Sequence, residues 1–198
     1  MPRTTPRTKF NFKSTWSICY FLMTGLCFGQ GATTSQPDPG PVAFIQNSLL
    51  EATAASENYK TLLEVVKATD LEDLLDQSGP FTLFAPSDVA FDGLIGETVE
   101  DLLHPMNREE LKALLSYHLV AGKVSASKIL KALCRGEGTA TLTTVQGDII
   151  TATMKGLDII LSDSFGNTAT IVVADAMQRN GIIHEIDAVI RPETANAD

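Results

Sequence analysis

The 198-residue sequence predicts an α+β protein with helices in its first half and an antiparallel sheet in its second half. Three observations support this class. Helical spacing of apolar residues dominates from 42 to about 133, period-two alternation dominates from about 139 to 190, and a short apolar strand at 81–85 interrupts the helical half. We therefore expect a curved antiparallel sheet or small sandwich with helices packed at one face and edge.

The first 31 residues are typical of a secretory signal peptide. Four basic residues and no acidic ones precede the apolar stretch ICYFLMTGLCFG at 18–29, and small residues mark the expected cleavage region at 29–32. The alternative is a lipoprotein signal ending at Cys27, although Thr24 and Leu26 fit such a signal poorly. The stretch is too short to span a bilayer as a mature helix. We therefore expect a secreted, periplasmic or cell-surface protein without a stable transmembrane segment.

The rest of the chain divides into a Pro-rich linker at 32–41, one folded domain at 42–193 and a C-terminal tail at 194–198. Loss of residues 1–31 changes the formal net charge from -9 to -13, because only basic charges are removed. So acidic a domain lacks the basic patch of a nucleic-acid-binding protein, and nucleic-acid partners are not expected.

Polar residues mark the expected helix starts in the first half. They are Ser56 before ENYKTLLEVVKA, Thr69 and Thr98 each three positions before an acidic residue, Asn107 before the helix that runs into LLSYHLV, and Ser125 before ASKILKAL. In each case the side-chain oxygen can accept a hydrogen bond from a free N–H of the first turn. Strand 81–85 should end at Pro86, whose ring nitrogen cannot donate to a ladder.

The second half reads as a meander of short strands. TLTTV, DIITATM, LDIILSD, TATIVVADAM and IIHEIDAVI alternate in polarity, and Gly-containing pairs separate them, including Asn180-Gly181. The early strand FTLFA must join this sheet from far away in sequence.

Three segments resemble, in the same order, motifs of the fasciclin (FAS1) domain family. They are FTLFAPSDVAF at 81–91, with Phe84, Pro86, Ser87 and Phe91; the pair Tyr117-His118, with Leu119 and Val120; and NGIIHEIDAVIRP at 180–192, with Asn180, Gly181, His184 and Asp187. The chain is identified as a single-domain, secreted, bacterial-type member, with the resemblance running from about 48 to 192.

The resemblance implies a wedge-like antiparallel β-sandwich flanked by helices. It also implies a non-enzymatic module for cell adhesion or extracellular-matrix interaction, whose partners are surface or matrix proteins or polysaccharide. In some animal members the Tyr-His region carries adhesion, which here points to Tyr117, His118, Leu119 and Val120 as interaction residues.

Catalytic and metal-binding patterns are weak in this sequence. No Gly-x-Ser-x-Gly elbow occurs, and Ser116 and His118 would point about 200 degrees apart on a helix. His104, His118 and His184 lie far apart in sequence and no Cys-x-x-Cys is present, so neither a metal nor another cofactor is expected. The alternatives are a periplasmic small-ligand-binding protein or an unspecific hydrolase that pairs a serine with His118 or His184.

The orientation of individual side chains follows from periodicity. His118 shares a helical face with Leu111, Leu114 and Leu115, and His184 shares a strand face with Ile182 and Ile186, so both histidines should be buried and hydrogen-bonded. Tyr117 lies off the leucine stripe, which predicts an outward-facing ring.

Cys134 is the single cysteine beyond the signal. It can form no intramolecular disulfide in an exported chain. We expect it to be buried or half-buried, with pairing between chains as the alternative.

Overall fold

The structure, a computed structural model, describes residues 46–94 and 103–192. The chain divides into the units 1–42 and 43–198, and all described residues belong to the second unit. The predicted signal peptide, linker, Thr98 cap and C-terminal tail lie outside the described residues.

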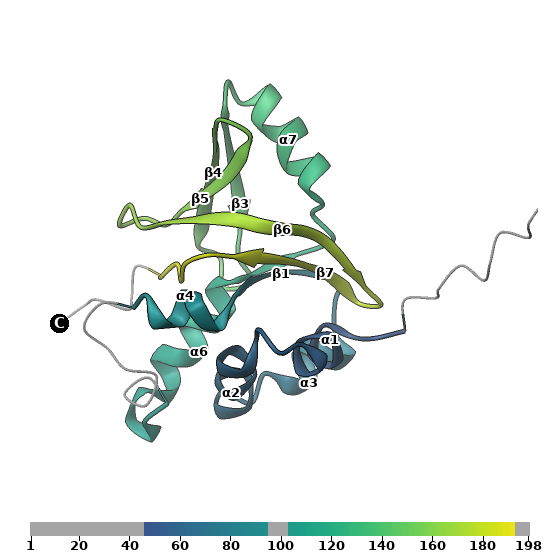
Figure 1. Ribbon diagram of the computed structural model, residues 1–198, viewed down its shortest axis with the longest axis vertical. Coiled ribbons are helices and arrows are strands. Elements are labelled where there is room, and N and C mark those ends of the chain that lie inside the picture. The colour runs from purple at the N-terminus through teal and green to yellow at the C-terminus, as the bar shows by residue number, and fades with distance from the viewer. Residues whose placement is uncertain (1–45, 95–102, 193–198) are drawn as a thin grey trace, which may run out of the picture. The chain divides into compact units, whose positions relative to one another are not determined.

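The described residues form helices, one short 3-10 helix and strands in the order that Figure 1 shows. The helices are α1 (Leu49–Ala55), α2 (Lys60–Ala68), α3 (Glu72–Gln77), α4 (Asp88–Asp92), η1 (Pro105–Asn107), α6 (Arg108–Tyr117) and α7 (Ala126–Arg135). The strands are β1 (Phe81–Pro86), β2 (Leu119–Ala121), β3 (Thr139–Thr143), β4 (Ile149–Lys155), β5 (Asp158–Ser162), β6 (Thr168–Gln178) and β7 (Gly181–Ile186). The α+β class predicted from the sequence is confirmed.

The strands form a seven-stranded sheet within the described residues, in the order β2-β1-β7-β6-β5-β4-β3. Strands β3 to β7 are the predicted antiparallel meander. β1 joins from a distance as expected, but its pairing with β7 is parallel, so the sheet is mixed rather than wholly antiparallel. β1 is buried along nearly its whole length, as is typical of a strand covered on both faces.

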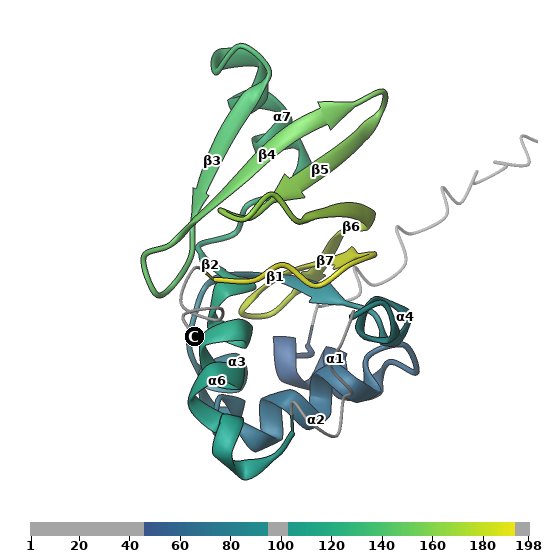
Figure 2. The same cartoon turned by 90° about the vertical axis from the view of Figure 1, so that its left-hand side faces the viewer.

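The sheet bends so strongly that its two terminal strands approach each other. A bridge joins Val120, in β2, to Thr144, just after β3, and the Val145 N–H donates to the Leu119 carbonyl at 2.8 Å. Figure 2 shows the turn between β3 and β4 beside β2. The sheet is therefore nearly closed, like a barrel.

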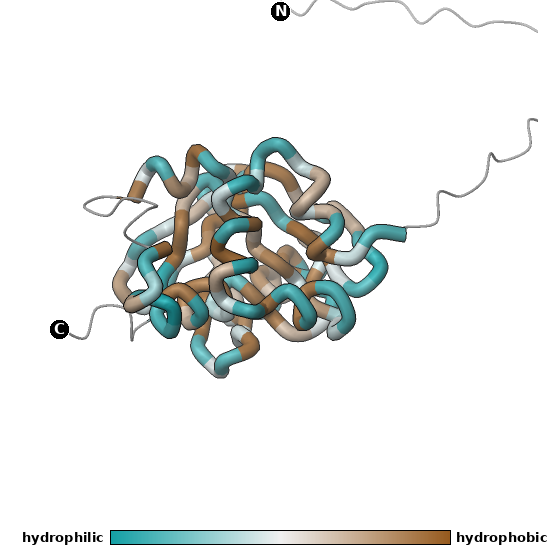
Figure 3. The backbone as a smooth tube through the Cα atoms, turned by 90° about the horizontal axis from the view of Figure 1, so that it is seen from below, coloured by the Kyte–Doolittle hydropathy of each residue, from teal (hydrophilic) through white to brown (hydrophobic). Residues whose placement is uncertain are grey.

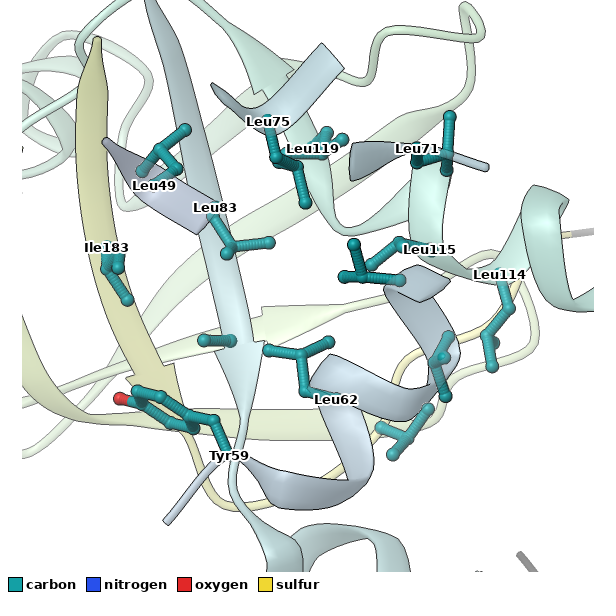
Figure 4. Packing of buried hydrophobic residues seen from close by; sticks show 14 of the residues in the cluster. Leu49, Tyr59, Leu62, Leu71, Leu75, Leu83, Leu114, Leu115, Leu119 and Ile183 are labelled. Carbon is teal, nitrogen blue, oxygen red and sulfur yellow. The ribbon is translucent and has the colours of Figure 1, made fainter. Parts of the chain in front are cut away.

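Two apolar clusters lie on opposite sides of β1. Helices α1, α2, α3 and α6 pack against Leu83 and Ala85 in the first cluster, part of which Figure 4 shows. Phe84 points to the other side, into a second cluster inside the bent sheet that α7 covers with Ile129 and Leu133. Figure 3 shows that hydrophobic (brown) and hydrophilic (teal) stretches alternate along the elements that build these clusters.

Some of the predicted caps are confirmed. The Ser125 hydroxyl accepts from the Lys128 N–H at the start of α7. Asn107 occupies the predicted cap position of α6, but its side chain accepts no hydrogen bond from the first turn of that helix. β1 ends at Pro86, as its missing N–H requires.

Two other caps are predicted wrongly. Ser56 follows the end of α1, and α2 begins after Tyr59. The Asp88 carboxylate, not Ser56, accepts from the first N–H groups of α2, including that of Thr61 at 2.8 Å. Thr69 is buried, and its hydroxyl donates back to the Val65 carbonyl instead of capping α3.

Candidate functional site

Tyr117 is buried, which corrects the prediction of an outward-facing ring. Its side chain is 1% exposed, and its hydroxyl donates to the Ile149 carbonyl at 2.9 Å. Burial, followed by the negative charges of Asp163 and Asp148, raises the pKa of Tyr117 to about 12. The phenol is therefore neutral at every physiological pH.

The position of Tyr117 at the end of α6 explains this burial. Leu111, Leu114 and Leu115 of the same helix belong to the first apolar cluster, whereas Tyr117 belongs to the second cluster inside the sheet. A residue off the leucine stripe faces solvent only if the helix packs against one core. α6 ends where the two clusters meet, so the Tyr117 side chain packs in the second cluster although the rest of the helix packs against the first.

Leu119 and Val120 are likewise buried, in β2. Leu119 pairs with Leu83 and Val120 with Thr82. These side chains pack inside the domain and present no surface to a partner. The predicted interaction segment 117–120 therefore forms part of the interior, where Leu119 and Val120 are covered, and an interaction role for the segment stays a prediction.

His118 is a buried histidine, as its sequence position predicts. Its Nδ1 lies 2.8 Å from the Leu114 carbonyl, to which it donates, and its Nε2 accepts from the Ile190 N–H at 3.4 Å. Desolvation lowers the pKa of His118 to about 4, against a smaller opposing effect of the hydrogen bond to Leu114. A second proton on Nε2 would face a backbone donor, so the ring is held neutral.

His184 has the same arrangement with the two ring nitrogens exchanged. Nε2 donates to the Val124 carbonyl at 2.8 Å, and Nδ1 accepts from the Asp175 N–H at 3.2 Å. The ring stacks on Phe84, with centroids 5.5 Å apart. Desolvation lowers its pKa, while the bond to Val124 and the charge of Asp175 act in the opposite direction.

Both ring nitrogens of each buried imidazole therefore form hydrogen bonds with backbone groups. A general base needs one nitrogen within reach of the proton that it abstracts. Neither His118 nor His184 offers one, so the arrangement cannot pair either of them with a serine as nucleophile and base. His104 is exposed, and its Nδ1 accepts from the Met106 N–H.

Asn180 joins three segments of the domain. Its Oδ1 accepts from the Leu49 N–H at the start of α1, and its Nδ2 donates to the carbonyls of Leu75 and Ser78 at the end of α3. The next residue, Gly181, lies against β1 so closely that a Cβ atom would stand 2.4 Å from the Phe81 carbonyl oxygen. Both motif residues therefore have structural roles.

The motif at 81–91 also forms part of the fold. The Ser87 carbonyl accepts from the N–H of Phe91 in α4, and Phe91 is 3% exposed. At the same end of the sheet, where β7 ends beside β1, the Asp187 carboxylate accepts from the Thr170 N–H at 2.6 Å and so ties the end of β7 to β6.

Asp163 is a buried carboxylate that our reading of the sequence missed. It accepts four hydrogen bonds, from the N–H groups of Phe165, Asn167 and Arg191 and from the Asn167 amide. The first two are local turn bonds, so the segment DSFGN carried a usable signal of an aspartate-initiated turn. The bond to Arg191 crosses 28 residues and has no local signal.

The described residues line hollows near the first two motifs, at 81–91 and 117–120. One of about 490 Å³ lies between the end of α4 and the segments around Asn167 and Asp187. Another, of about 340 Å³, is lined by Tyr117, Gly147, Asp148, Ile149 and Ser164. Tyr117 thus reaches a concave surface despite its low exposure.

Within residues 46–94 and 103–192, no group of three or more His, Cys, Asp or Glu side chains is arranged to hold a metal ion. The same residues include no helix long and apolar enough to cross a membrane. Cys134 is exposed, contrary to our expectation, because it lies on α7 away from the buried face of Ile129 and Leu133.

The chain matches one protein family and is similar to several known proteins. The family model of the Fasciclin domain matches residues 57–192. Protein sll1483 of Synechocystis is 38% identical over 145 residues, which cover 73% of each chain. Immunogenic protein MPB70 of Mycobacterium bovis is 30% identical over 78% of this chain and 69% of the relative. Human periostin is 29% identical over 74% of this chain but only 16% of its own length.

A solved structure shows the same fold. It is the FAS1 domain pair of the insect cell adhesion molecule Fasciclin I, with a TM-score of 0.65 and 18% sequence identity. The match covers 75% of this chain and 52% of that one, so this chain spans about half of the solved structure.

Proposed function

Because the chain belongs to the Fasciclin domain family, we propose that it is a secreted or surface-associated, non-enzymatic FAS1 module that binds surface or matrix proteins or polysaccharide. The proposal includes export through residues 1–31, a linker at 32–41 and a folded domain at 42–193. The adhesion role follows from the family resemblance and from the kind of molecule in which the fold has been solved.

The observation that carries the non-enzymatic part is the hydrogen bonding of His118 and His184. Each ring donates to one carbonyl and accepts from one backbone N–H, so each acts as a fixed link between chain segments. The three motifs supply side chains that complete the interior, and contact with a partner involves the surface around them and the hollow that Tyr117 lines.

Binding of the purified domain to cells, biofilm polymer and immobilised surface proteins tests the proposed function. We expect saturable binding to at least one of these surfaces, with heat-denatured protein as the control. Absence of binding to all of them, by a protein with a cooperative unfolding transition, would contradict the proposal.

The N-terminus of the exported protein tests the proposed processing. Mass spectrometry should find a new N-terminus between about residues 29 and 32. A lipid-modified N-terminus at Cys27 would identify the lipoprotein alternative, and an intact chain in the cytoplasm would exclude export.

A second candidate, a small-ligand-binding protein, is favoured by the two hollows. Their volumes, about 490 and 340 Å³, fall at the lower end of those of small-molecule sites. A ligand-dependent rise in melting temperature on a metabolite panel would support it. The third alternative, a Ser/His hydrolase, predicts labelling by a serine-reactive probe, and we expect none.

A further inference from the structure

The hollow beneath Tyr117 combines a negative charge, hydroxyl groups and an apolar wall. Its five lining residues are Tyr117, Gly147, Asp148, Ile149 and Ser164. They come from the end of α6, the turn between β3 and β4 with the first residue of β4, and the turn between β5 and β6. Three segments far apart in sequence therefore build one concave site, whose volume of about 340 Å³ exceeds that of a single amino-acid side chain.

The charge of the hollow is negative. Asp148 is half-buried, its Oδ2 accepts from the Gln146 amide at 2.5 Å, and its Oδ1 receives no hydrogen bond from the residues that the structure describes. Asp163 adds a second carboxylate next to the lining residue Ser164. None of the five lining residues is basic.

The hydroxyl of Tyr117 adds a hydrogen-bond acceptor. The hydroxyl donates its proton to the Ile149 carbonyl, with 2.9 Å between the two oxygen atoms. A phenolic oxygen that donates its proton can still accept through its lone pairs. The nearby carboxylates of Asp163 and Asp148 make this oxygen a better partner for a cation than for an anion.

An apolar rim completes the site. Ile149 lines the hollow and is 56% exposed, and Phe165, which follows the lining residue Ser164, is 48% exposed. Such a surface fits a ligand with an apolar stem and a charged head, which is how a lysine side chain is built. A bare divalent cation fits less well, because Ca²⁺ takes six to eight oxygen ligands and the lining offers one carboxylate.

We propose that this hollow binds a primary ammonium group on an aliphatic stem, with a lysine side chain of a basic partner protein as its ligand. Asp148 Oδ1 pairs with the ammonium, the Tyr117 oxygen and the Ser164 hydroxyl accept its remaining N–H groups, and Ile149 contacts the stem. The inference rests on the proposed function in one respect, that the ammonium belongs to a macromolecular partner, and it adds the chemistry by which that partner is recognised.

A titration followed by amide NMR tests this site with defined probes. Nα-acetyl-lysine amide is the ligand probe, its Nε-acetylated form removes the charge, and a glucosamine oligomer presents the same ammonium on a polysaccharide. The lysine probe should give saturable shifts of the amides at 147, 148, 149 and 164, and its Nε-acetylated form should give none there.

Asp148→Asn should raise the Kd of the lysine probe about five-fold, as expected for a partly screened ion pair. The matched control is Asp158→Asn, which removes one charge from an exposed site at the opposite end of β5 and should leave the Kd unchanged. An equal loss in both variants would mean that net charge, not the hollow, attracts the probe, and would overturn the inference.

Two further outcomes would also overturn it. They are equal binding of the acetylated probe, and a response to the glucosamine oligomer with none to the lysine probe. A protein that adheres to cells or matrix but ignores the lysine probe would refute this site and leave the proposed function standing. A protein that binds the probe in the hollow but adheres to nothing would support this site and contradict the proposed function.

Discussion

The buried histidines should make the domain less stable as the pH falls through the weakly acidic range. The pKa of His118 is about 4 in the folded protein, whereas a histidine in an unfolded chain has a pKa of about 6.5. Below about pH 6.5 the unfolded chain therefore binds a proton that the folded chain excludes. The stability that His118 contributes is fully present above that pH and is lost as the pH falls toward about 4.

The magnitude follows from the difference between these two pKa values. Between about pH 7.5 and about pH 5.5, His118 should lower the free energy of unfolding by about 1.3 kcal/mol. The pKa of His184 is lowered too, because its ring is buried, so its effect has the same sign. Carboxyl groups begin to titrate at lower pH, which is why the upper window isolates the histidines.

Urea unfolding of an untagged protein at a series of pH values measures this effect. His118→Gln removes one titrating group, so its stability should depend less steeply on pH than that of the wild type, even though the variant is less stable. His104→Gln removes an exposed histidine and is the matched control, which should keep the wild-type slope. A flat wild-type profile across the window would refute the reasoning and mean that both rings can be protonated in the folded state.

Three other perturbations have defined outcomes. Asn180→Ala removes the acceptor of the Leu49 N–H and the donor to the end of α3, and should cost about 2 kcal/mol in urea unfolding, since partly buried backbone groups lose their partners. Tyr117→Phe keeps the ring but leaves the Ile149 carbonyl without its donor, so we expect a loss of about 1 kcal/mol, and an unchanged midpoint would contradict the hydrogen bond. Cys134 is exposed and should react with a maleimide in the native protein at the rate seen in urea, whereas strong protection would show that it is covered.

The sequence was most informative where a residue packs against its neighbours along the chain. His184 alternates with isoleucines in β7, and Ser125 directly precedes α7, so burial of the one and capping by the other could be predicted from spacing. The fold class follows from the same periodicities.

The errors occur where a partner lies far away in sequence. Tyr117 is off the leucine stripe, and nothing in the helix indicates that a second core begins there. α2 is capped by Asp88, 27 residues beyond Thr61, so the nearer candidate Ser56 was the wrong choice. Asp163 holds Arg191 across 28 residues by the same kind of contact. Such contacts form only when the chain has folded, because they join segments that are far apart in sequence, and the residues next to each partner do not indicate them.

The contact between Val120 and Thr144 has a consequence for the behaviour of this protein at high concentration. An open sheet ends in two strands with unpaired N–H and C=O groups, which can recruit strands from other copies and start aggregation. Here β2 and β3, which end the sheet, turn toward each other, and the Val145 N–H already bonds the Leu119 carbonyl. The strands that end the sheet thus shield one another, and we expect few unpaired backbone groups there to recruit strands from other copies.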